Sequence, residues 1–511
     1  MLLSYSLYAF SESMLAEYRA IRLNIQVSQQ QQVAHSGIEV ARHQLSSRNN
    51  FKRSQFEYFL ATHEQSIGMI DGLNASFVFR HQNGTSRQLS PGMENESGKL
   101  NINSLPLQLS RADEARARLT ALPGIDLRIA DSILDWLDDD DNTRPAGAET
   151  SFYSQLGYRP RQGQVQSLGE LLRVRGITPE LLFGEDKNAN SWLDANENDG
   201  DISAPRDNAD DILDRGLSAW ITVNGAESTL DENGSPKINI NGKRLDELYD
   251  ALLPRLGKRA AQFVVAYRLE GPLRPSRLIE MDAKQRMQRR LETAEARLRK
   301  HLGIETPFEN PGSEFKDTFR AGIDMSRTGS YQIESLLDLF GARVLATINT
   351  KQEILESPWE QNAPSLQATL GQLESILTTT PGLRRIDRIN PVSAPREVLL
   401  TIPGFGDGQV NSIVQTRHRI LANASAMDRF HSIAWLVTEA GLSFEHLQKA
   451  APYLTAGGDR FRGFALGRLD GSSNQSVLSF VLDATEKTPV TLRTRTWRSI
   501  PRVTVRPSSQ N

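Results

Sequence analysis

The chain has 511 residues, of which 38% are hydrophobic and 24% charged, and its formal net charge is −3. This composition is typical of a globular protein of roughly two to four domains, and it argues against a strongly basic nucleic-acid-binding chain. The absence of cysteine excludes disulfides, thiol catalysis and cysteine-bound zinc.

The N-terminal segment is unusually apolar. Apolar residues at helical spacing predict one long helix, and we expect residues 1–65 to be mostly helical, with Gln29–Gln32 continuing the helix without favouring burial. No run of about 18 apolar residues occurs, so the chain contains no complete membrane-spanning helix. The apolar pattern of this segment is typical of the second half of a membrane helix that continues as an amphipathic stalk. An ordinary amphipathic surface helix is the alternative. The apolar stripe consists of Leu3, Leu7, Phe10, Met14, Ile21 and Ile25.

Two regions of alternating sequence predict a β-sheet. Residues 73–81 form the first strand, and Asn83-Gly84 is a hairpin signal that leads to a second strand at 86–89. The C-terminal region alternates in the same way. It predicts further antiparallel strands at residues 461–469, 477–483 and 490–497.

A weak internal repeat runs through the middle of the chain. In each copy an Ile-Asn pair precedes a pair of apolar helices, and a Pro-Gly turn joins the helices of the first and last copies. The amides of such a helix-hairpin-helix turn can bind a DNA phosphate, usually with a lysine or arginine nearby. Acidic residues follow the first turn here, so we expect a structural role. The Ile-Asn pairs are at 102–103, 240–241 and 389–390, and the helix pairs at 119–137, 248–268 and 398–417.

The segment from Asp186 to Glu197 has the ligand spacing of an EF-hand calcium loop. Short polar side chains on alternate residues and a closing glutamate suit a hard cation that takes about six to eight oxygens. Position 6, where glycine is favoured, holds Ser191, and no long helices flank the loop. An acidic loop of Asx turns without metal is the alternative. The expected ligands are Asp186, Asn188, Asn190, Trp192 through its carbonyl, Asp194 and Glu197.

A second acidic run follows the first helix pair. Four adjacent aspartates repel one another unless a cation neutralises them, and a glutamate follows shortly afterwards. We therefore predict a second cation site, for which a solvated acidic helix end is the alternative. Its expected ligands are Asp138, Asp140, Asp141 and Glu149.

Catalytic signatures are missing from the sequence. It contains no P-loop, no His-Glu-x-x-His motif and no dinucleotide-binding glycine pattern after a strand. Ser313 and Lys316 match a Ser-x-x-Lys pattern, but they lie in a linker flanked by glycine and proline, and we assign that match to chance. We therefore expect a protein that is not an enzyme.

Several segments together resemble the type II secretion system minor pseudopilin K, also called general secretion pathway protein K. The similarity covers most of residues 10–260 and 330–455, in the family's order. It rests on SGKLNIN at 97–103, ALPGIDLRIADSILDWLD at 121–138, RPAGAE at 144–149, LLRVRGITPELL at 171–182 and INPVSAPREVLLTIPGFGDGQVNSIVQTR at 389–417.

This resemblance implies an α+β fold in which an N-terminal pilin-like helix packs on an antiparallel sheet. A large inserted α-helical domain would contain helix-hairpin-helix (SAM-like) repeats and bind calcium (Ca2+) in its acidic loops. The implied partners are minor pseudopilins I and J and the major pseudopilin, with no nucleic acid. The implied location is the bacterial inner membrane, crossed once, with the globular part in the periplasm. The family's prepilin cleavage pattern is absent, so the chain matches only the later half of the family's helix.

On this basis we divide the chain into seven segments. They are the pilin-type helix at 1–50, the first part of the pilin α/β domain at 51–103, the inserted helical domain with its acidic calcium-binding loops at 104–217, a β-element and degenerate helical hairpin at 218–272, a charged helix and linker at 273–330, a second helical-hairpin region at 331–456, and C-terminal strands and tail at 457–511.

Two functions follow from the sequence. The preferred one is a structural minor pseudopilin at the tip of the type II secretion pseudopilus, which supports protein export across the outer membrane. The alternative is a helix-hairpin-helix DNA-binding protein of the competence type. The acidic flanks and the membrane-like N-terminus favour the first, because a DNA-binding surface needs positive charge.

Overall fold

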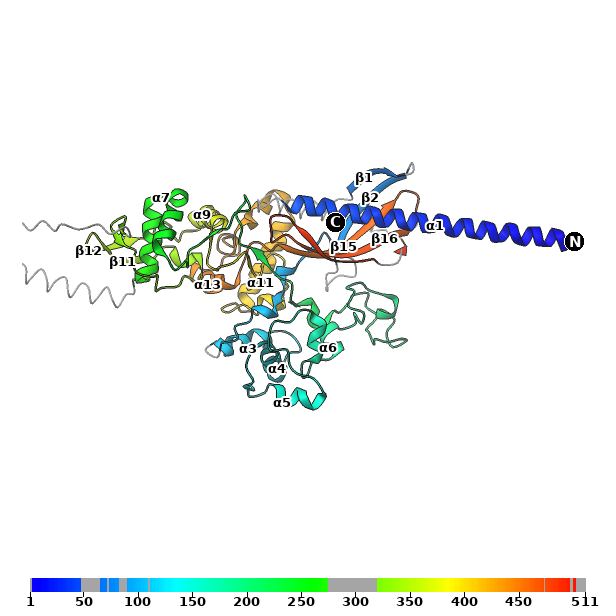
Figure 1. Cartoon of the computed structure of the whole chain (residues 1–511), viewed down its shortest axis with the longest axis horizontal. Coiled ribbons are helices and arrows are strands. Elements are labelled where there is room, and N and C mark those ends of the chain that lie inside the picture. Colours follow the sequence, from blue (N-terminus) through cyan, green and yellow to red (C-terminus); the bar gives the residue numbers. More distant parts are fainter. Residues whose placement is uncertain are drawn as a thin grey trace, which may run out of the picture. The chain divides into compact units, whose positions relative to one another are not determined.

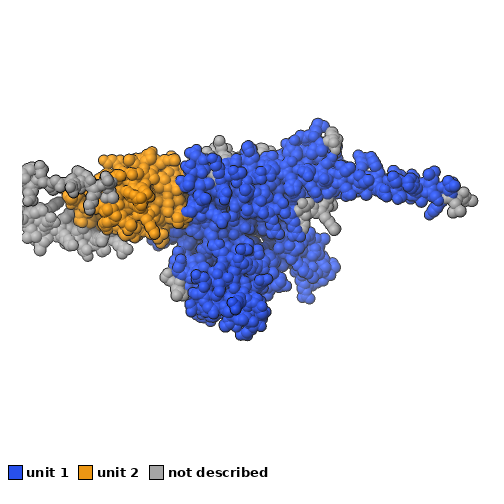
Figure 2. Space-filling view, in the orientation of Figure 1, with its two compact units in different colours: residues 1–236, 382–511 blue, residues 237–381 orange. Residues whose placement is uncertain are grey.

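The computed structural model describes residues 2–46, 65–70, 73–81, 90–108, 111–273, 319–472, 474–496 and 500–501 (Figure 1). These residues fall into two compact units (Figure 2). The first unit is formed by residues 1–236 and 382–511, and the second by residues 237–381. The first unit contains all the predicted metal ligands.

The N-terminal helix α1 (Leu2–Leu45) has two halves with different surroundings. Its first half, residues 3–25, extends beyond the sheet and leaves its large apolar side chains between 49% and 86% exposed (Figure 1). A Cβ at Gly467 would lie 2.0 Å from the carbonyl oxygen of Gln30, so this glycine lets the second half approach the sheet closely. That half packs on the sheet through Val33, Ala34, Ile38, Ala41 and Leu45.

Two expectations concern this helix. Residues 2–45 are helical, as expected, and the strand β1 begins at Gln65; residues 47–64 lie outside the described part. Gln30 belongs to a tract whose composition does not favour burial, yet it is 1% exposed. Its Nε2 donates to the Ser472 hydroxyl (2.9 Å) and to the Asn474 carbonyl (2.8 Å), so the buried amide is satisfied by the far end of the chain.

An antiparallel sheet runs in the order β1-β2-β15-β16-β17. The first two strands come from the N-terminal region and the last three from the C-terminal end, so the sheet is formed by two parts of the chain that are far apart in sequence. The short strands β3 (Ser90–Pro91), β4 (Glu94–Asn95) and β18 (Ile500–Pro501) pair with β2, β15 and β16. The main strands are β1 (Gln65–Ile70), β2 (Leu73–His81), β15 (Arg460–Leu469), β16 (Asn474–Asp483) and β17 (Val490–Thr496).

The strand predicted at 73–81 and the antiparallel C-terminal strands are confirmed. The Asn83-Gly84 turn and the strand predicted at 86–89 lie outside the described residues. One face of the sheet packs on α1 through aromatic side chains, with Phe79 in edge contact with Phe77 and Phe480 at 5.4 Å between ring centroids. The other face carries a smaller cluster of Val78, Phe464, Leu466 and Val477.

The insertion begins with a region of short elements, which we call the inserted lobe (residues 104–217). Around it are the connecting elements η1 (Glu96–Gly98), β5 (Leu100–Asn101), η2 (Ile102–Ser104), β6 (Ile221–Thr222) and β7 (Glu227–Ser228). The lobe itself contains α3 (Ala112–Thr120), α4 (Leu127–Leu137), α5 (Thr150–Tyr153), η4 (Ser154–Leu156), η5 (Leu168–Arg173), α6 (Pro179–Phe183) and η6 (Ala195–Glu197), and it ends within η7 (Gly216–Ala219).

The same unit resumes after residue 381 with a second helical region. Its elements are β14 (Arg384–Arg385), α10 (Arg396–Leu399), α11 (Asp407–Leu421), η9 (Ala424–His431), α12 (Trp435–Thr438), α13 (Phe444–Ala450) and η10 (Ala451–Tyr453). The pairs α3–α4 and α10–α11 are joined by similar turns, with a positive φ at Gly124 (78°) and Gly404 (89°). Their identity as helix-hairpin-helix (SAM-like) repeats remains a prediction.

The second unit is a mixture of helices and short strand pairs. Its long element α7 (Leu245–Glu270) is two helices joined at Gly257, whose φ is 80°. The charged helix predicted at 282–303 lies outside the described residues. The other elements are β8 (Ile238–Asn239), β9 (Phe319–Arg320), β10 (Ile323–Asp324), η8 (Leu336–Leu339), β11 (Arg343–Ile348), β12 (Lys351–Glu356), α9 (Ala363–Ile376) and β13 (Leu377–Thr378).

None of the helices in the described ranges is both long and apolar enough to cross a membrane.

Candidate functional site

The predicted calcium loop, Asp186 to Glu197, is held in shape by its own backbone. The buried Asp186 carboxylate accepts hydrogen bonds from the backbone N–H groups of Asn190 and Ser191, both at 2.8 Å. The buried Glu197 carboxylate accepts from two further backbone N–H groups of the loop, at 3.1 and 3.2 Å. The first and last acidic residues of the motif therefore both bind backbone of the loop that they enclose.

The middle of the loop gathers the other predicted ligands. The side-chain amides of Asn188 and Asn190 donate to one oxygen of Asp194, at 2.8 and 2.7 Å. Ser191, which stands where an EF-hand loop favours glycine, has a φ of +60°. This is the left-handed conformation that glycine adopts most easily, so the serine makes the turn that the motif needs.

Two of the acidic side chains of the loop, Asp186 and Glu197, are buried, and Asp194 is half-buried beside them. Burial raises the pKa of Asp186. Burial, together with the nearby charges of Asp186 and Asp194, raises the pKa of Glu197 to about 7. A cation would relieve this repulsion, and the donor set of carboxylates and amides matches the oxygen ligands that calcium takes.

Trp192, at position 7 of the loop, links the loop to the sheet. Its ring lies edge-on to Phe464 of β15, with 5.2 Å between ring centroids. It packs there against the second face of the sheet, the one that α1 does not cover. Trp192, whose carbonyl is a predicted ligand, thus also contacts the sheet through its ring.

A second set of carboxylates converges at the end of α4. Asp135, Asp138 and Glu149 are all buried, and one oxygen of each lies within 4.8 Å of the others. Within the described ranges this is the one group of His, Cys, Asp and Glu side chains that meets that distance. Both oxygens of Glu149 and one of Asp138 have no hydrogen-bond partner. Burial and the charges of Asp135 and Asp138 raise the pKa of Glu149 to about 8.

The turn after α4 builds this cluster. Arg144 returns to the helix end, where its Nη1 donates to Asp135 at 2.7 Å and also to Asp138. A Cβ at Gly147 would lie 1.9 Å from an Asp135 oxygen, so only glycine lets the turn pass and bring Glu149 into place. Arg144 neutralises part of the charge, and the two oxygens of Glu149 stay buried without a hydrogen-bond partner.

Only two of the four residues predicted for this cluster lie in it. The structure brings Asp138 and Glu149 together, but it leaves Asp140 and Asp141 exposed outside the cluster. Their carboxylates accept from the backbone N–H groups of Asn142 (2.7 Å) and Thr150 (3.1 Å). Asp135, which the sequence prediction did not include, is part of the cluster. It stands three residues before Asp138, the residue at the C-terminal cap of α4, and this spacing is the signal that could have found it.

A buried ion network fixes the place where the insertion leaves the sheet. Glu94 of β4 pairs with Lys99 at 3.1 Å and with Arg215, at the end of the inserted lobe, at 3.3 Å. Burial opposes ionisation of Glu94, but these two cations hold its pKa well below the ordinary value. The lobe that carries both acidic clusters thus contacts the sheet through the Arg215–Glu94 ion pair as well as through Trp192.

The structure is a mixed α+β protein in which a long N-terminal helix packs on an antiparallel sheet, as expected of a pilin-like protein. Residues 98–183 match the family model described as "Type II secretion system (T2SS), protein K". This match confirms the resemblance to the minor pseudopilin K family that the sequence indicated, and it covers the segment that carries the Asp135–Glu149 cluster.

One solved structure is similar to the chain over most of its length. It is the GspK-GspI-GspJ complex of the type II secretion system from enterotoxigenic Escherichia coli. The sequence identity is 10% and the TM-score 0.30, with 94% of this chain and 99% of the other chain covered. Comparison with curated proteins gives no match.

Proposed function

We propose that this chain is a structural, non-enzymatic minor pseudopilin at the tip of the type II secretion pseudopilus, where it supports protein export across the outer membrane. The observation that carries the proposal is the first half of α1. Eleven large apolar side chains there, Leu3, Tyr5, Leu7, Tyr8, Phe10, Met14, Leu15, Tyr18, Ile21, Leu23 and Ile25, are at least 49% exposed. The match of residues 98–183 to the protein K family supports the same function.

The exposed half of α1 also indicates the partners. An apolar surface of this size normally marks a contact with a membrane or with other helices. The proposed partners are the I and J minor pseudopilins and the major pseudopilin, whose helices would cover residues 3–25. The proposed location is the bacterial inner membrane, with α1 continuing a single membrane-spanning helix and the globular part in the periplasm.

We also infer that the inserted lobe binds calcium. Asp186, Asn188, Asn190, the Trp192 carbonyl, Asp194 and Glu197 would hold one ion, and Asp135, Asp138 and Glu149 would hold another. Bound calcium would neutralise buried carboxylates and so stiffen the lobe. The support is the buried oxygens of Glu149 without hydrogen bonds and the crowded carboxylates of the loop.

The alternative function, DNA binding through helix-hairpin-helix turns, is disfavoured by the charges at those turns. Asp126 caps α4 by accepting from the N–H of Ile129 at 2.9 Å, and Asp407 begins α11. An aspartate at each helix N-terminus repels a phosphate from the position where the turn would bind it. A mobility-shift titration with duplex DNA tests this alternative: tight binding that weakens steeply with salt would replace the pseudopilin proposal.

The main test is substitution of the exposed half of α1. The triple variant Leu7→Ser, Phe10→Ser, Met14→Ser should abolish secretion of an exported reporter protein and co-purification with the I and J pseudopilins. Thermal unfolding of the body should be unchanged, because these side chains do not pack on it. A matched variant, Glu17→Ser with Arg22→Ser, alters polar positions of the same half and should secrete normally. Normal secretion by the triple variant would overturn the proposal.

A further inference from the structure

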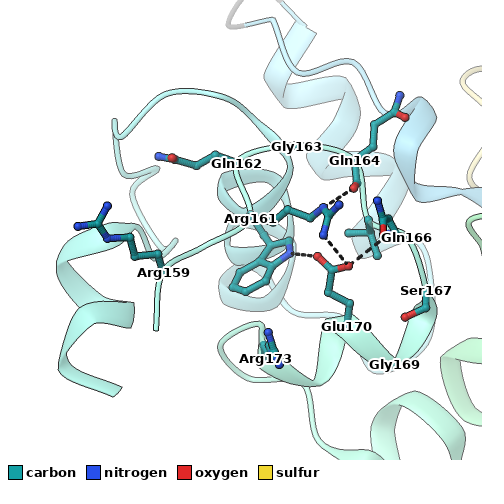
Figure 3. Close-up of a pocket in the computed structure, with 12 residues that line it drawn as sticks. Arg159, Arg161, Gln162, Gly163, Gln164, Gln166, Ser167, Gly169, Glu170 and Arg173 are labelled. Atoms are coloured by element: carbon teal, nitrogen blue, oxygen red, sulfur yellow. Dashed lines mark hydrogen bonds and ion pairs between the residues drawn. The ribbon is translucent and has the colours of Figure 1, made fainter. Parts of the chain in front are cut away.

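The inserted lobe contains a wide polar concavity that neither metal cluster uses. It has a volume of about 980 Å³ and lies between the extended segment after Tyr158 and the helix η5 (Figure 3). Three arginines and four glutamines or serines dominate its wall, and the single acidic residue is Glu170. The lining residues are Trp136, Arg159, Arg161, Gln162, Gly163, Gln164, Val165, Gln166, Ser167, Gly169, Glu170 and Arg173.

The wall of this concavity is built firmly. The side chain of Asn103 both donates to the carbonyl of Val165 (2.9 Å) and accepts from its N–H (2.8 Å). Glu170 accepts from the Trp136 indole at 3.3 Å and from the backbone N–H of Gln166 at 3.2 Å, and it pairs with Arg161 at 3.4 Å (Figure 3). Glu170 is therefore engaged in holding the wall, and its charge is largely compensated.

Other polar side chains of the wall make no hydrogen bond or ion pair with the described residues. Arg159 and Arg173 are exposed, and their guanidinium groups make no hydrogen bond or ion pair within the described part of the chain. The side-chain amides of Gln164 and Gln166 are likewise without partners there. The concavity thus presents two unpaired positive charges beside amides that can both donate and accept.

We propose that this concavity binds an extended polypeptide segment rich in aspartate and glutamate, carried by a partner protein. Guanidinium groups are the side chains best suited to carboxylates, because they offer paired donors in a planar fork. Glutamine amides match the N–H and C=O groups of an extended backbone. The wall is too polar and too open for an apolar small molecule, whose sites are enclosed and mostly hydrophobic.

The neighbouring acidic run favours a peptide over a nucleic acid. The Gln162 amide donates to the Asp140 carbonyl at 3.0 Å, so the exposed aspartates 139–141 border the concavity. A duplex carries a charge about every 1.7 Å and cannot keep its phosphates away from these aspartates. A peptide can place isolated carboxylates at Arg159 and Arg173 and neutral residues beside the acidic border. This proposal does not depend on the role of the protein in secretion.

Fluorescence anisotropy of the full chain with a labelled peptide of alternating glutamate and serine tests the proposal. Wild-type protein should bind it at physiological salt, and more tightly than a glutamine–serine peptide. The double variant Arg159→Gln, Arg173→Gln should raise the Kd at least about tenfold. Both side chains are exposed and unpaired, so thermal unfolding should not change. The reversed variant Arg159→Glu, Arg173→Glu should instead prefer a lysine–serine peptide.

The matched control removes the same charge elsewhere on the lobe. Arg128 and Arg206 are 74% and 89% exposed and lie outside the concavity. The variant Arg128→Gln, Arg206→Gln should keep wild-type affinity. Equal weakening in both double variants would overturn the proposal, because it would show unspecific charge attraction. Equal binding of the glutamate and glutamine peptides, failure of the reversed variant to prefer lysine, or full competition by duplex DNA would overturn it as well.

Discussion

The two acidic clusters of the inserted lobe are satisfied in different ways. In the loop, the buried carboxylates of Asp186 and Glu197 accept four hydrogen bonds from backbone N–H groups. In the cluster at the end of α4, the Glu149 carboxylate accepts no hydrogen bond, while Asp135 and Asp138 share Arg144. The loop is thus organised by its own backbone, whereas the cluster depends on an arginine and leaves one carboxylate bare.

The different hydrogen bonding of the two sites affects the pKa values of their buried glutamates. Backbone N–H groups favour the ionised form, so the pKa of Glu197 rises only to about 7 despite its burial. Without such donors, burial and neighbouring charges raise the pKa of Glu149 to about 8. The raised pKa of Glu149 means that a proton would compete with a cation for its oxygens.

The largest expected effect is the response to calcium. Saturating calcium should stabilise the wild-type protein, by about 2.7 kcal/mol when the free ion is a hundredfold above the Kd of a site. The variant Asp186→Ala, Glu197→Ala should lose most of the response that the loop provides, and Asp138→Ala, Glu149→Ala should lose that of the cluster. Differential scanning calorimetry with calcium or a chelator measures each contribution.

The control for this comparison is the variant Asp139→Ala, Asp201→Ala. Both residues are exposed acids outside the two sets of ligands. The control should respond to calcium like the wild-type protein. A wild-type melting temperature that does not depend on calcium would contradict both proposed sites at once.

The next effect is the pH dependence of the metal-free protein. The folded-state pKa of Glu149 is raised to about 8. Its stabilising contribution is therefore fully present below the ordinary glutamate pKa and is lost as pH rises to about 8. The variant Glu149→Gln should flatten this decline and be more stable than wild type at pH 8 by about 1–3 kcal/mol.

Denaturant titrations in chelator between pH 5 and pH 9 measure this effect. The variant Glu197→Gln is the comparison, because the pKa of Glu197 is raised to about 7 and its part of the decline should end earlier. Identical pH profiles for wild type and Glu149→Gln would mean that Glu149 does not titrate in the folded cluster.

The parts of the fold that depend on local pattern could be predicted from the sequence. Strand 73–81 alternates, and its burial follows the pattern, with Phe77 and Phe79 against α1 and Val78 on the other face. The burial of Gln30 could not be predicted, because its partners Ser472 and Asn474 lie more than 440 residues away in the sequence. Such a contact exists only once the C-terminal strands pair with the N-terminal ones.

The same limit applies to the candidate sites. The spacing of the loop was visible because its proposed ligands are local, although only the structure shows that Ser191 takes the left-handed conformation. The proximity of Asp135 to Glu149 could not be predicted from the sequence, because it exists only when the turn through Gly147 folds back on α4. The calcium assignment of both sites stays a prediction.

The contact between loop and sheet allows a third test. Trp192→Ala should lower the free energy of unfolding by about 1–3 kcal/mol, less than for a fully buried tryptophan, because its ring packs on Phe464 while remaining partly exposed. It should also weaken the calcium response of the loop and leave that of the α4 cluster unchanged. Trp192→Phe, which keeps an aromatic contact, is the matched control. Equal weakening at both sites would show that the two clusters are coupled through the lobe rather than through the sheet.

The smallest effect concerns the serine at position 6 of the loop. Ser191 has a φ of +60°, and its hydroxyl makes no hydrogen bond within the described part of the chain. Ser191→Gly relieves a left-handed backbone but adds freedom to the unfolded chain, so the net gain should be about 0.5–1 kcal/mol.

The left-handed backbone at position 191 is part of the loop conformation that would bind calcium. Because glycine adopts it with less strain than serine, the calcium affinity of the loop should rise about two- to fivefold. Asn349→Gly, at a φ of 47° in the turn between β11 and β12, is the control. It should give a smaller gain in stability, because asparagine tolerates the left-handed conformation better than serine, and it should not change calcium affinity. If both variants gain stability but neither binds calcium more tightly, the shape of the loop at Ser191 does not limit ion binding, and the oxygen ligands alone set the affinity.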